Sequence, residues 1–174
     1  LPVHWQTAAV LLGAWSCGAT VVDTAAEDED RLDGVDVVLA AQDRLGALED
    51  AGIQELLGLS LHPLGMGMAG YTGPARDFAL EVRAHGDVFL PYATADPSAA
   101  GLAVGHLELT LGGLVDAAVE LAGRLGLVAG DRLVVDEGTA LEAGPVAWLL
   151  APLSAGASIV LCRNPRPDAL AARA

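Results

Sequence analysis

One short pattern occurs twice in this chain, and it restricts the fold more than any other feature. Residues 11–22 and 149–160 share a Leu-Leu pair, a Ser, a Gly-Ala pair and a closing Val at matching positions. Each copy predicts an apolar helix, a glycine just past the helix end, and then a buried strand. A repeated element of this kind is typical of parallel α/β proteins. The sequence therefore predicts an α/β fold with mainly parallel sheets and flanking helices.

The two copies differ in what precedes them. A strand over residues 131–135 comes before the second copy, whereas the first copy begins directly with its helix. Since a βαβ unit has a strand on both sides of its helix, we expect an N-terminal segment that supplies the strand beside residues 19–23. No low-complexity linker divides the chain, so we expect a single α/β domain of two pseudo-repeated lobes, about residues 1–86 and 87–174.

Apolar periodicity and turn residues predict the individual elements. Helices are expected at about residues 3–17, 43–51, 75–85, 107–125 and 144–153, and a short one from Asp168. Strands are expected at about residues 19–23, 35–40, 56–61, 88–92, 102–105, 131–135 and 157–162. A glycine-rich loop is expected over residues 63–74.

The charge balance excludes several functions. The chain has 23 acidic and 9 basic residues, a formal net charge of −14, and every basic residue is Arg. A field of this sign repels phosphates, so nucleic acid and anionic membranes are not expected partners. Without lysine, the chain itself has no Schiff-base chemistry and no Walker-type lysine.

Two uncharged stretches, residues 1–22 and 143–162, approach the length of about 20 residues that a spanning helix needs. A Gly-Ala pair and a β-branched run divide each stretch into helix, turn and strand, so no membrane span is expected. The stretches also show no basic region of a signal peptide. Because two cysteines cannot form a disulfide framework, a reducing cytoplasm is the expected location. The two cysteines, Cys17 and Cys162, are too few for a disulfide framework and are expected to be small core residues.

Three further patterns indicate little chemistry. Residues 65–70 match G-x-G-x-x-G, but no helix begins in the motif, so a flexible surface loop is expected rather than a dinucleotide site. The acidic cluster at residues 27–36 lacks the ligand spacing of a calcium loop and is expected to be a solvated loop. The four histidines fall in separate elements, and no metal site is expected.

Residues 87–106 carry more information. A strand leads to a loop of small residues and a short strand, and His106 stands just before a long helix. Gly130-Asp131-Arg132 then opens another strand. This order resembles the AMP-forming acyl-CoA synthetase superfamily, also called the adenylate-forming or AMP-binding enzymes. The chain start at residues 1–5, Gly18-Ala19 and residues 148–159 are similar to further motifs of that superfamily, so the resemblance covers nearly the whole chain.

The resemblance implies a fold like the N-terminal subdomains of these synthetases. It also implies a vestigial phosphate loop, whose candidate cofactor-binding residues are Tyr92, Thr94, Ser98, Gly101 and His106. It assigns no catalytic residue and no metal ligand. The chain resembles an actinobacterial family of short proteins that are similar to the AMP-binding enzymes but lack their core motifs.

The loop departs from the superfamily pattern in ways that bear on function. Ala-Asp-Pro-Ser-Ala-Ala at residues 95–100 replaces the serine, threonine and glycine run that binds ATP phosphates, and the loop lysine is missing. Asp96 places a negative charge where phosphates would lie, and Pro97 removes an amide donor. We therefore expect a non-catalytic binding or assembly protein without a cofactor. The alternatives are an acyl-adenylating or acyl-CoA ligase-type enzyme that uses ATP/AMP or CoA and acts with a missing segment or partner, and an unrelated α/β nucleotide binder.

The predicted helix over residues 107–125 carries an apolar stripe wider than one sheet contact needs. Exposed apolar patches usually mark partner sites. We therefore expect a homodimer or a protein partner through this helix or the helix at residues 144–153. The alternative is that one monomer buries both helices between two layers.

Overall fold

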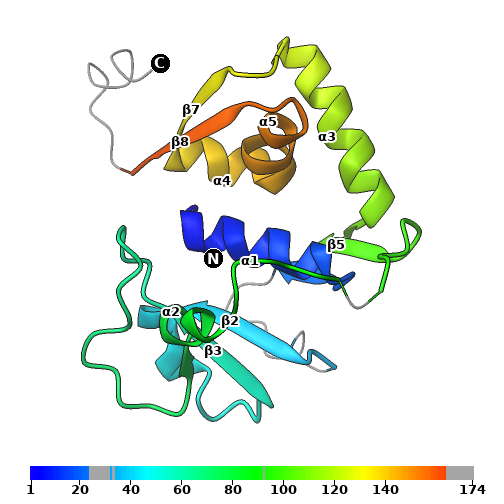
Figure 1. The fold of residues 1–174 in the computed structure, drawn as a ribbon. Coiled ribbons are helices and arrows are strands. Elements are labelled where there is room, and N and C mark those ends of the chain that lie inside the picture. The colour runs from blue at the N-terminus through cyan, green and yellow to red at the C-terminus, as the bar shows by residue number, and fades with distance from the viewer. Residues whose placement is uncertain (24–31, 33, 92, 164–174) are drawn as a thin grey trace. The chain divides into compact units, whose positions relative to one another are not determined.

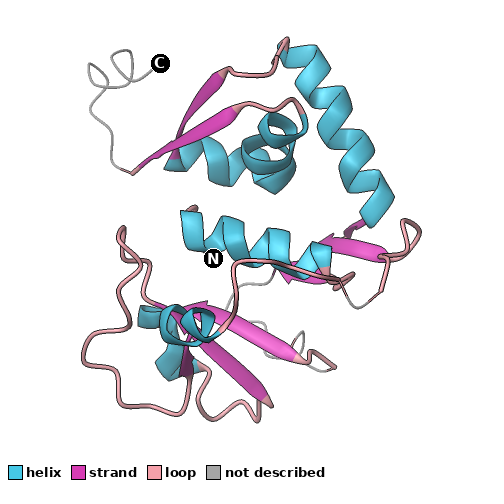
Figure 2. Cartoon of the chain, viewed as in Figure 1, coloured by secondary structure: helices cyan, strands magenta, loops and turns pink. Residues whose placement is uncertain are grey.

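The structure is a computed structural model that describes residues 1–23, 32, 34–91 and 93–163 (Figure 1). The chain divides into two compact units. One comprises residues 23–91 with Leu1, and the other comprises residues 2–22 with the chain from residue 92 onward. In the described part of the chain, loops connect helices with strands that pair mainly in parallel (Figure 2), which confirms the predicted α/β class. The single-domain arrangement of two lobes stays a prediction.

The unit of residues 23–91 is built on a three-stranded parallel sheet in the order β2-β3-β4. Its elements are β2 (Val37–Ala41), η2 (Gln42–Ala47), β3 (Glu55–Leu59), β4 (Arg76–Asp77), α2 (Phe78–Glu81) and η3 (Val82–Ala84). Leu45 of η2 is fully buried in the small core of this unit, together with Leu48 and Ala75. Leu45 reaches this core because η2 follows β2 directly and contacts both β2 and β3.

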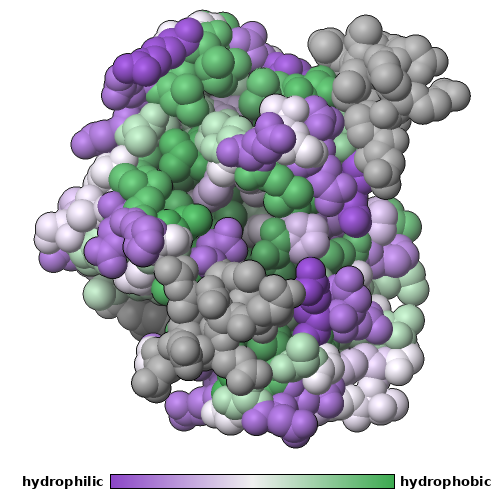
Figure 3. Space-filling view, turned by 180° about the vertical axis from the view of Figure 1, so that it is seen from behind, coloured by the Kyte–Doolittle hydropathy of each residue, from purple (hydrophilic) through white to green (hydrophobic). Residues whose placement is uncertain are grey.

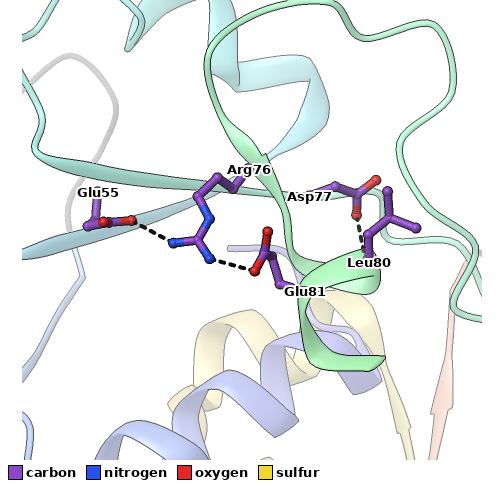
Figure 4. Close-up of polar contacts among 5 residues, drawn as sticks. All are labelled: Glu55, Arg76, Asp77, Leu80 and Glu81. Carbon is purple, nitrogen blue, oxygen red and sulfur yellow. Dashed lines mark hydrogen bonds and ion pairs between the residues drawn. The ribbon is translucent and has the colours of Figure 1, made fainter. Parts of the chain in front are cut away.

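Side chains at the end of this sheet fix the turn into α2 (Figure 4). Arg76 Nη1 pairs with Glu55 on β3 at 3.1 Å, and Arg76 Nη2 pairs with Glu81 on α2. Asp77 caps α2, since its Oδ1 accepts hydrogen bonds from the amides of Ala79 and Leu80. The Arg76 pairs are solvent-exposed and contribute little to stability, whereas the cap sets where the helix begins.

The other unit holds the sheet β1-β5-β6 and the parallel pair β7-β8. Its elements are α1 (Trp5–Ser16), β1 (Val21–Asp23), β5 (Ala100–Val104), β6 (Leu107–Thr110), α3 (Leu111–Leu125), β7 (Arg132–Asp136), α4 (Glu137–Pro145), the π-helix η4 (Val146–Leu150), α5 (Ala151–Ser154) and β8 (Ser158–Cys162). Helix α3 packs against η4 and α5. The core of this unit includes Leu11, Trp15, Leu102, Leu114 and Trp148.

The repeated sequence builds the same helix end twice. Gly18 after α1 has φ 76° and Gly156 after α5 has φ 75°, a left-handed conformation that glycine adopts without steric cost. In both copies the glycine amide donates to the carbonyl three residues back, at 3.0 Å. The amide of the following alanine donates to the carbonyl five residues back, at 2.9 Å. This is a Schellman motif, and it confirms the predicted role of both glycines.

The long helix begins later than the sequence predicted. Residues 107–110 form β6, antiparallel to β5, and α3 begins only at Leu111. Leu107 and Leu109 alternate with polar neighbours, which is the two-residue period of a strand. Thr110 ends the strand and caps the helix, because its Oγ1 accepts a hydrogen bond from Gly113 N at 3.0 Å.

Four other expected elements also differ. No strand forms over residues 88–91. These residues favour a strand, but a strand also needs a neighbouring strand to pair with, and none pairs with them in the described chain. The helix expected at 43–51 is the shorter 3₁₀ helix η2, and that expected at 75–85 opens with β4, which pairs with β3. The helix expected at 144–153 starts earlier, at Glu137, and Gly144 (φ 74°) kinks it before Pro145.

The remaining predicted strands and α1 agree with the structure to within two residues at most of their ends. The helix expected from Asp168 and most of the acidic cluster lie outside the described residues. No helix in the described part of the chain is both long and apolar enough to cross a membrane.

Candidate functional site

The predicted phosphate-loop residues lie on three consecutive segments of one unit. Tyr92 falls outside the described residues. Thr94 and Ser98 are exposed in the loop before β5, Gly101 is buried on β5, and His106 is exposed in the turn between β5 and β6.

The β5-β6 hairpin separates these residues rather than gathering them. Ala100 pairs with Thr110, which places the end of the loop beside the start of α3. Val104 pairs with Leu107, so His106 lies at the opposite end of the hairpin. At about 3.3 Å per residue, β5 holds His106 on the order of 16 Å from the loop. The structure therefore brings Ser98 and Gly101 to the start of α3, and it leaves His106 apart.

The loop uses its own donors internally. Asp96 Oδ1 accepts hydrogen bonds from the Ser98 amide at 2.9 Å and from Ser98 Oγ at 2.8 Å. Both hydrogen bonds lower the pKa of Asp96 below its usual 3.8, and the one from the backbone amide has the larger effect. Asp96 is therefore a carboxylate at neutral pH. It occupies the two donors that Ser98 could offer to a phosphate.

The start of α3 is also closed by the chain. Amides at a helix N-terminus normally form a ready site for an anion. Here Leu111 N donates to Ala99 O at 2.9 Å, and Gly112 N donates to Pro97 O at 2.8 Å. Gly113 N donates to the Thr110 cap. The first three amides of α3 thus bind loop carbonyls and a side chain of the chain itself.

Packing accounts for the glycine that the resemblance placed in the phosphate loop. A Cβ on Gly101 would lie 2.8 Å from Leu114 Cδ1 and 3.1 Å from the backbone nitrogen of Leu111. The Gly101 carbonyl accepts a hydrogen bond from Trp15 Nε1 at 2.8 Å, which ties α1 to β5. Gly101 is therefore needed where β5, α1 and α3 meet.

Sequence reasoning missed the two contacts that anchor this region. The Trp15–Gly101 hydrogen bond joins residues 86 positions apart, and no local signal predicts it. The Thr110 cap had a signal, because a Thr directly before an apolar helical run is a typical N-cap.

The glycine-rich motif at residues 65–70, in the other unit, surrounds a side chain of its own chain. Met68 N donates to Asp77 Oδ2 at 2.5 Å, and a Cβ on Gly67 would lie 2.6 Å from that oxygen. Arg83 Nη2 donates to Gly65 O at 3.0 Å. Residues 65–70 form a loop rather than the start of a helix, as predicted, and side chains of Asp77 and Arg83 hydrogen-bond to it. The flexibility of this loop stays a prediction.

Among the residues that the structure describes, no group of three or more His, Cys, Asp or Glu side chains could hold a metal ion. Cys162 is buried, as predicted, but Cys17 is exposed, and its expected place in the core was wrong. The core side of α1 is occupied instead by Leu11 and Trp15, and Cys17 follows at the exposed helix end.

Comparison with known proteins identifies the family. No family model matches the chain. Over 184 aligned residues the chain is 40% identical to the TIGR03089 family protein of Mycobacterium tuberculosis, an alignment that covers 99% of this chain and 68% of that protein. The chain belongs to the TIGR03089 family.

Solved structures show which fold this family member has. Similar chains are an acyl-CoA synthetase from Brucella canis (TM-score 0.67, 17% identity) and a mutant coronafacic acid ligase from Pectobacterium brasiliense (0.66, 10%). A third is a mutant amide bond synthetase from Marinactinospora thermotolerans (0.64, 18%). They cover 92–97% of this chain, which spans only 31–34% of theirs. The resemblance to the acyl-CoA synthetases is thereby confirmed at the level of the fold.

Proposed function

We propose that this TIGR03089 family member is a non-catalytic binding or assembly protein of the cytoplasm, built on a part of the acyl-CoA synthetase fold. The supporting observation is that its phosphate loop is closed: Asp96 occupies the donors of Ser98, and loop carbonyls occupy the first amides of α3. A nucleotide phosphate would have to displace a carboxylate and open these hydrogen bonds. We therefore propose no catalytic residue and no ATP, AMP or CoA cofactor.

Calorimetry on the intact chain with ATP·Mg²⁺, AMP and an acyl-CoA tests this proposal. We expect no saturable binding at micromolar concentration. The variant Asp96→Asn removes the charge but keeps an oxygen that can accept from Ser98, so the turn should persist. Asp116→Asn, on the exposed face of α3, is the matched control for the loss of one negative charge. Micromolar ATP affinity in the parent chain would overturn the proposal.

An acyl-adenylating or acyl-CoA ligase-type enzyme remains a second candidate, because the similar structures are ligases and this chain spans about a third of each. In that case a further segment or a partner would complete the site, with ATP/AMP or CoA as cofactor. ATP binding that appears in Asp96→Asn and not in Asp116→Asn would favour this candidate. It would show that one charge separates the loop from a nucleotide site.

Helix α3 supplies the surface for the proposed assembly. Its core face is made by Leu111, Leu114, Ala118 and Ala122, whereas Val115 is 60% exposed and Val119 is 55% exposed. These two valines lie one turn apart and form an apolar flank of the helix. Figure 3 shows apolar side chains at the molecular surface beside hydrophilic ones. Residues 144–153 instead bury Trp148, Leu149 and Ala151, so α3 is the proposed contact for a homodimer or a protein partner.

A further inference from the structure

His4 is a buried histidine that caps the first helix. His4 is only 6% exposed, and its Nδ1 accepts a hydrogen bond from the backbone N–H of Gln6 at 3.1 Å. The backbone of His4 is extended (φ −157°, ψ 158°), as an N-cap requires. A ring nitrogen can accept a hydrogen bond only while it carries no proton, so the neutral ring has its proton on Nε2. The cap therefore exists in one protonation state of the ring and not in the other.

The surroundings of His4 oppose a positive charge on the ring. The pKa of His4 lies below its usual 6.5, mainly because the ring is buried. The positive charge of Arg163, just after β8, is a second and smaller cause. Arg163 Nε is itself paired with Glu137 Oε2 of α4, at 3.5 Å. Within the described part of the chain, no carboxylate forms an ion pair with His4. A protonated ring would thus be repelled by the charge of Arg163, and no described carboxylate would pair with it directly.

The cap connects to the core of this unit through α1. Val3, just before the cap, is 4% exposed, and Leu11 and Trp15 on α1 belong to the same core. Thr7 Oγ1 donates to Pro2 O at 2.7 Å, which holds the segment before the cap against the first turn. Loss of the cap would therefore loosen a segment that the core otherwise buries.

We propose that His4 makes the start of α1 a proton-sensitive latch. The neutral ring holds the first turn closed. Protonation removes the acceptor for the Gln6 amide, places a second positive charge near Arg163, and releases residues 2–7 from the core. This device acts in α1 and is independent of whether the phosphate loop binds a nucleotide.

The direction of the pH effect follows from linkage. Since the folded chain binds a proton at His4 less readily than the unfolded chain, the unfolded state binds more protons as the pH falls through about 6.5. The stability from the cap is therefore present above this pH. It is lost as the pH falls toward the pKa of His4 in the folded chain, which is lower than 6.5.

Thermal unfolding of the intact chain at about pH 7.5 and about pH 5.5 tests the latch. We expect the Tm of the parent chain to fall by about 2–4 °C at the lower pH, the size expected for one lost N-cap. In His4→Asn the fall should disappear, because Asn is a good cap that does not titrate. His85→Asn, an exposed histidine in the other unit, is the matched control and should keep the fall.

Two further measurements keep the test decisive. His4→Ala should have a lower Tm than the parent chain at about pH 7.5 and should show no fall of its own, because the cap is already lost. If His4→Asn does not fold, hydrogen exchange of the Gln6 amide in the parent chain replaces it, and protection should drop at the lower pH beyond the intrinsic effect of pH. A fall in Tm of equal size in parent and His4→Asn, or Gln6 protection that does not change, would overturn the proposal.

Discussion

Replacement of Gly101 by alanine is expected to destabilise the chain, because the new methyl group has no room. A Cβ there would lie 2.8 Å from Leu114 Cδ1, 3.0 Å from Leu111 Cδ2 and 3.1 Å from Leu111 N. Carbon atoms normally pack at about 3.5–4.0 Å, so the leucine tips must move by roughly 0.5–1 Å. The backbone nitrogen of Leu111 cannot move aside as a side chain can. Its N–H also donates a hydrogen bond to Ala99 O, which holds it in place at the start of α3.

The magnitude follows from two opposing effects. Overpacking of this kind costs about 1–3 kcal/mol, and the reduced freedom of the unfolded chain offsets roughly 0.4–1 kcal/mol. We therefore expect Gly101→Ala to lower the free energy of unfolding by about 1–2 kcal/mol and Tm by about 2–8 °C. Urea unfolding followed by circular dichroism measures the first quantity, and a thermal scan measures the second.

Gly123→Ala is the matched control for this prediction. It makes the same chemical change inside α3, where a Cβ would meet no atom within 4 Å. Alanine is the better helix former, so this variant should gain about 0.5–1 kcal/mol. If Gly101→Ala were as stable as Gly123→Ala, the claim that packing requires glycine at residue 101 would be refuted.

Three further variants test other parts of the structure. Trp15→Phe removes the hydrogen bond to the Gly101 carbonyl and should cost about 1–3 kcal/mol in urea unfolding, since a buried acceptor loses its partner; an unchanged midpoint would contradict this. Thr110→Ala removes the cap of α3 and should cost about 0.5–2 kcal/mol, whereas Thr110→Asn should retain most of it. If α3 forms a homodimer, light scattering should find monomer for Val119→Asp, and salt should strengthen the parent dimer because each chain carries a net charge of −14; a parent chain that is monomeric at micromolar concentration would remove support for the homodimer.

The parts of the fold predicted from sequence are those that local chemistry determines. A glycine after an apolar helix has few alternatives to the left-handed conformation, and Gly18 and Gly156 both adopt it. The strands at β2, β3, β7 and β8 were predicted because short apolar runs bounded by turn residues have little choice of structure. The order of these elements was enough to indicate the synthetase fold.

The missed elements depend on partners distant in the sequence. Residues 88–91 have strand propensity, yet they form no strand because no neighbouring strand pairs with them in the described chain. Residues 107–110 were merged into the following helix because their leucines fit both periods, and only pairing with β5 distinguishes the two. Gly101 matched a phosphate loop in sequence, and its packing against Leu114 appears only once α3 lies over β5.

The loop before β5 is closed by its own hydrogen bonds, and a titration with ATP·Mg²⁺ followed by amide NMR is the sharpest test of this closure. The signals to follow are those of the backbone amides of Ser98, Leu111 and Gly112. These amides donate hydrogen bonds to the carboxylate of Asp96, the carbonyl of Ala99 and the carbonyl of Pro97, respectively. These three signals should stay in place as ATP·Mg²⁺ rises through the micromolar range. Saturable shifts of the same three amides at micromolar ATP would show that a phosphate replaces the internal acceptors, and the loop would then not be closed to nucleotide.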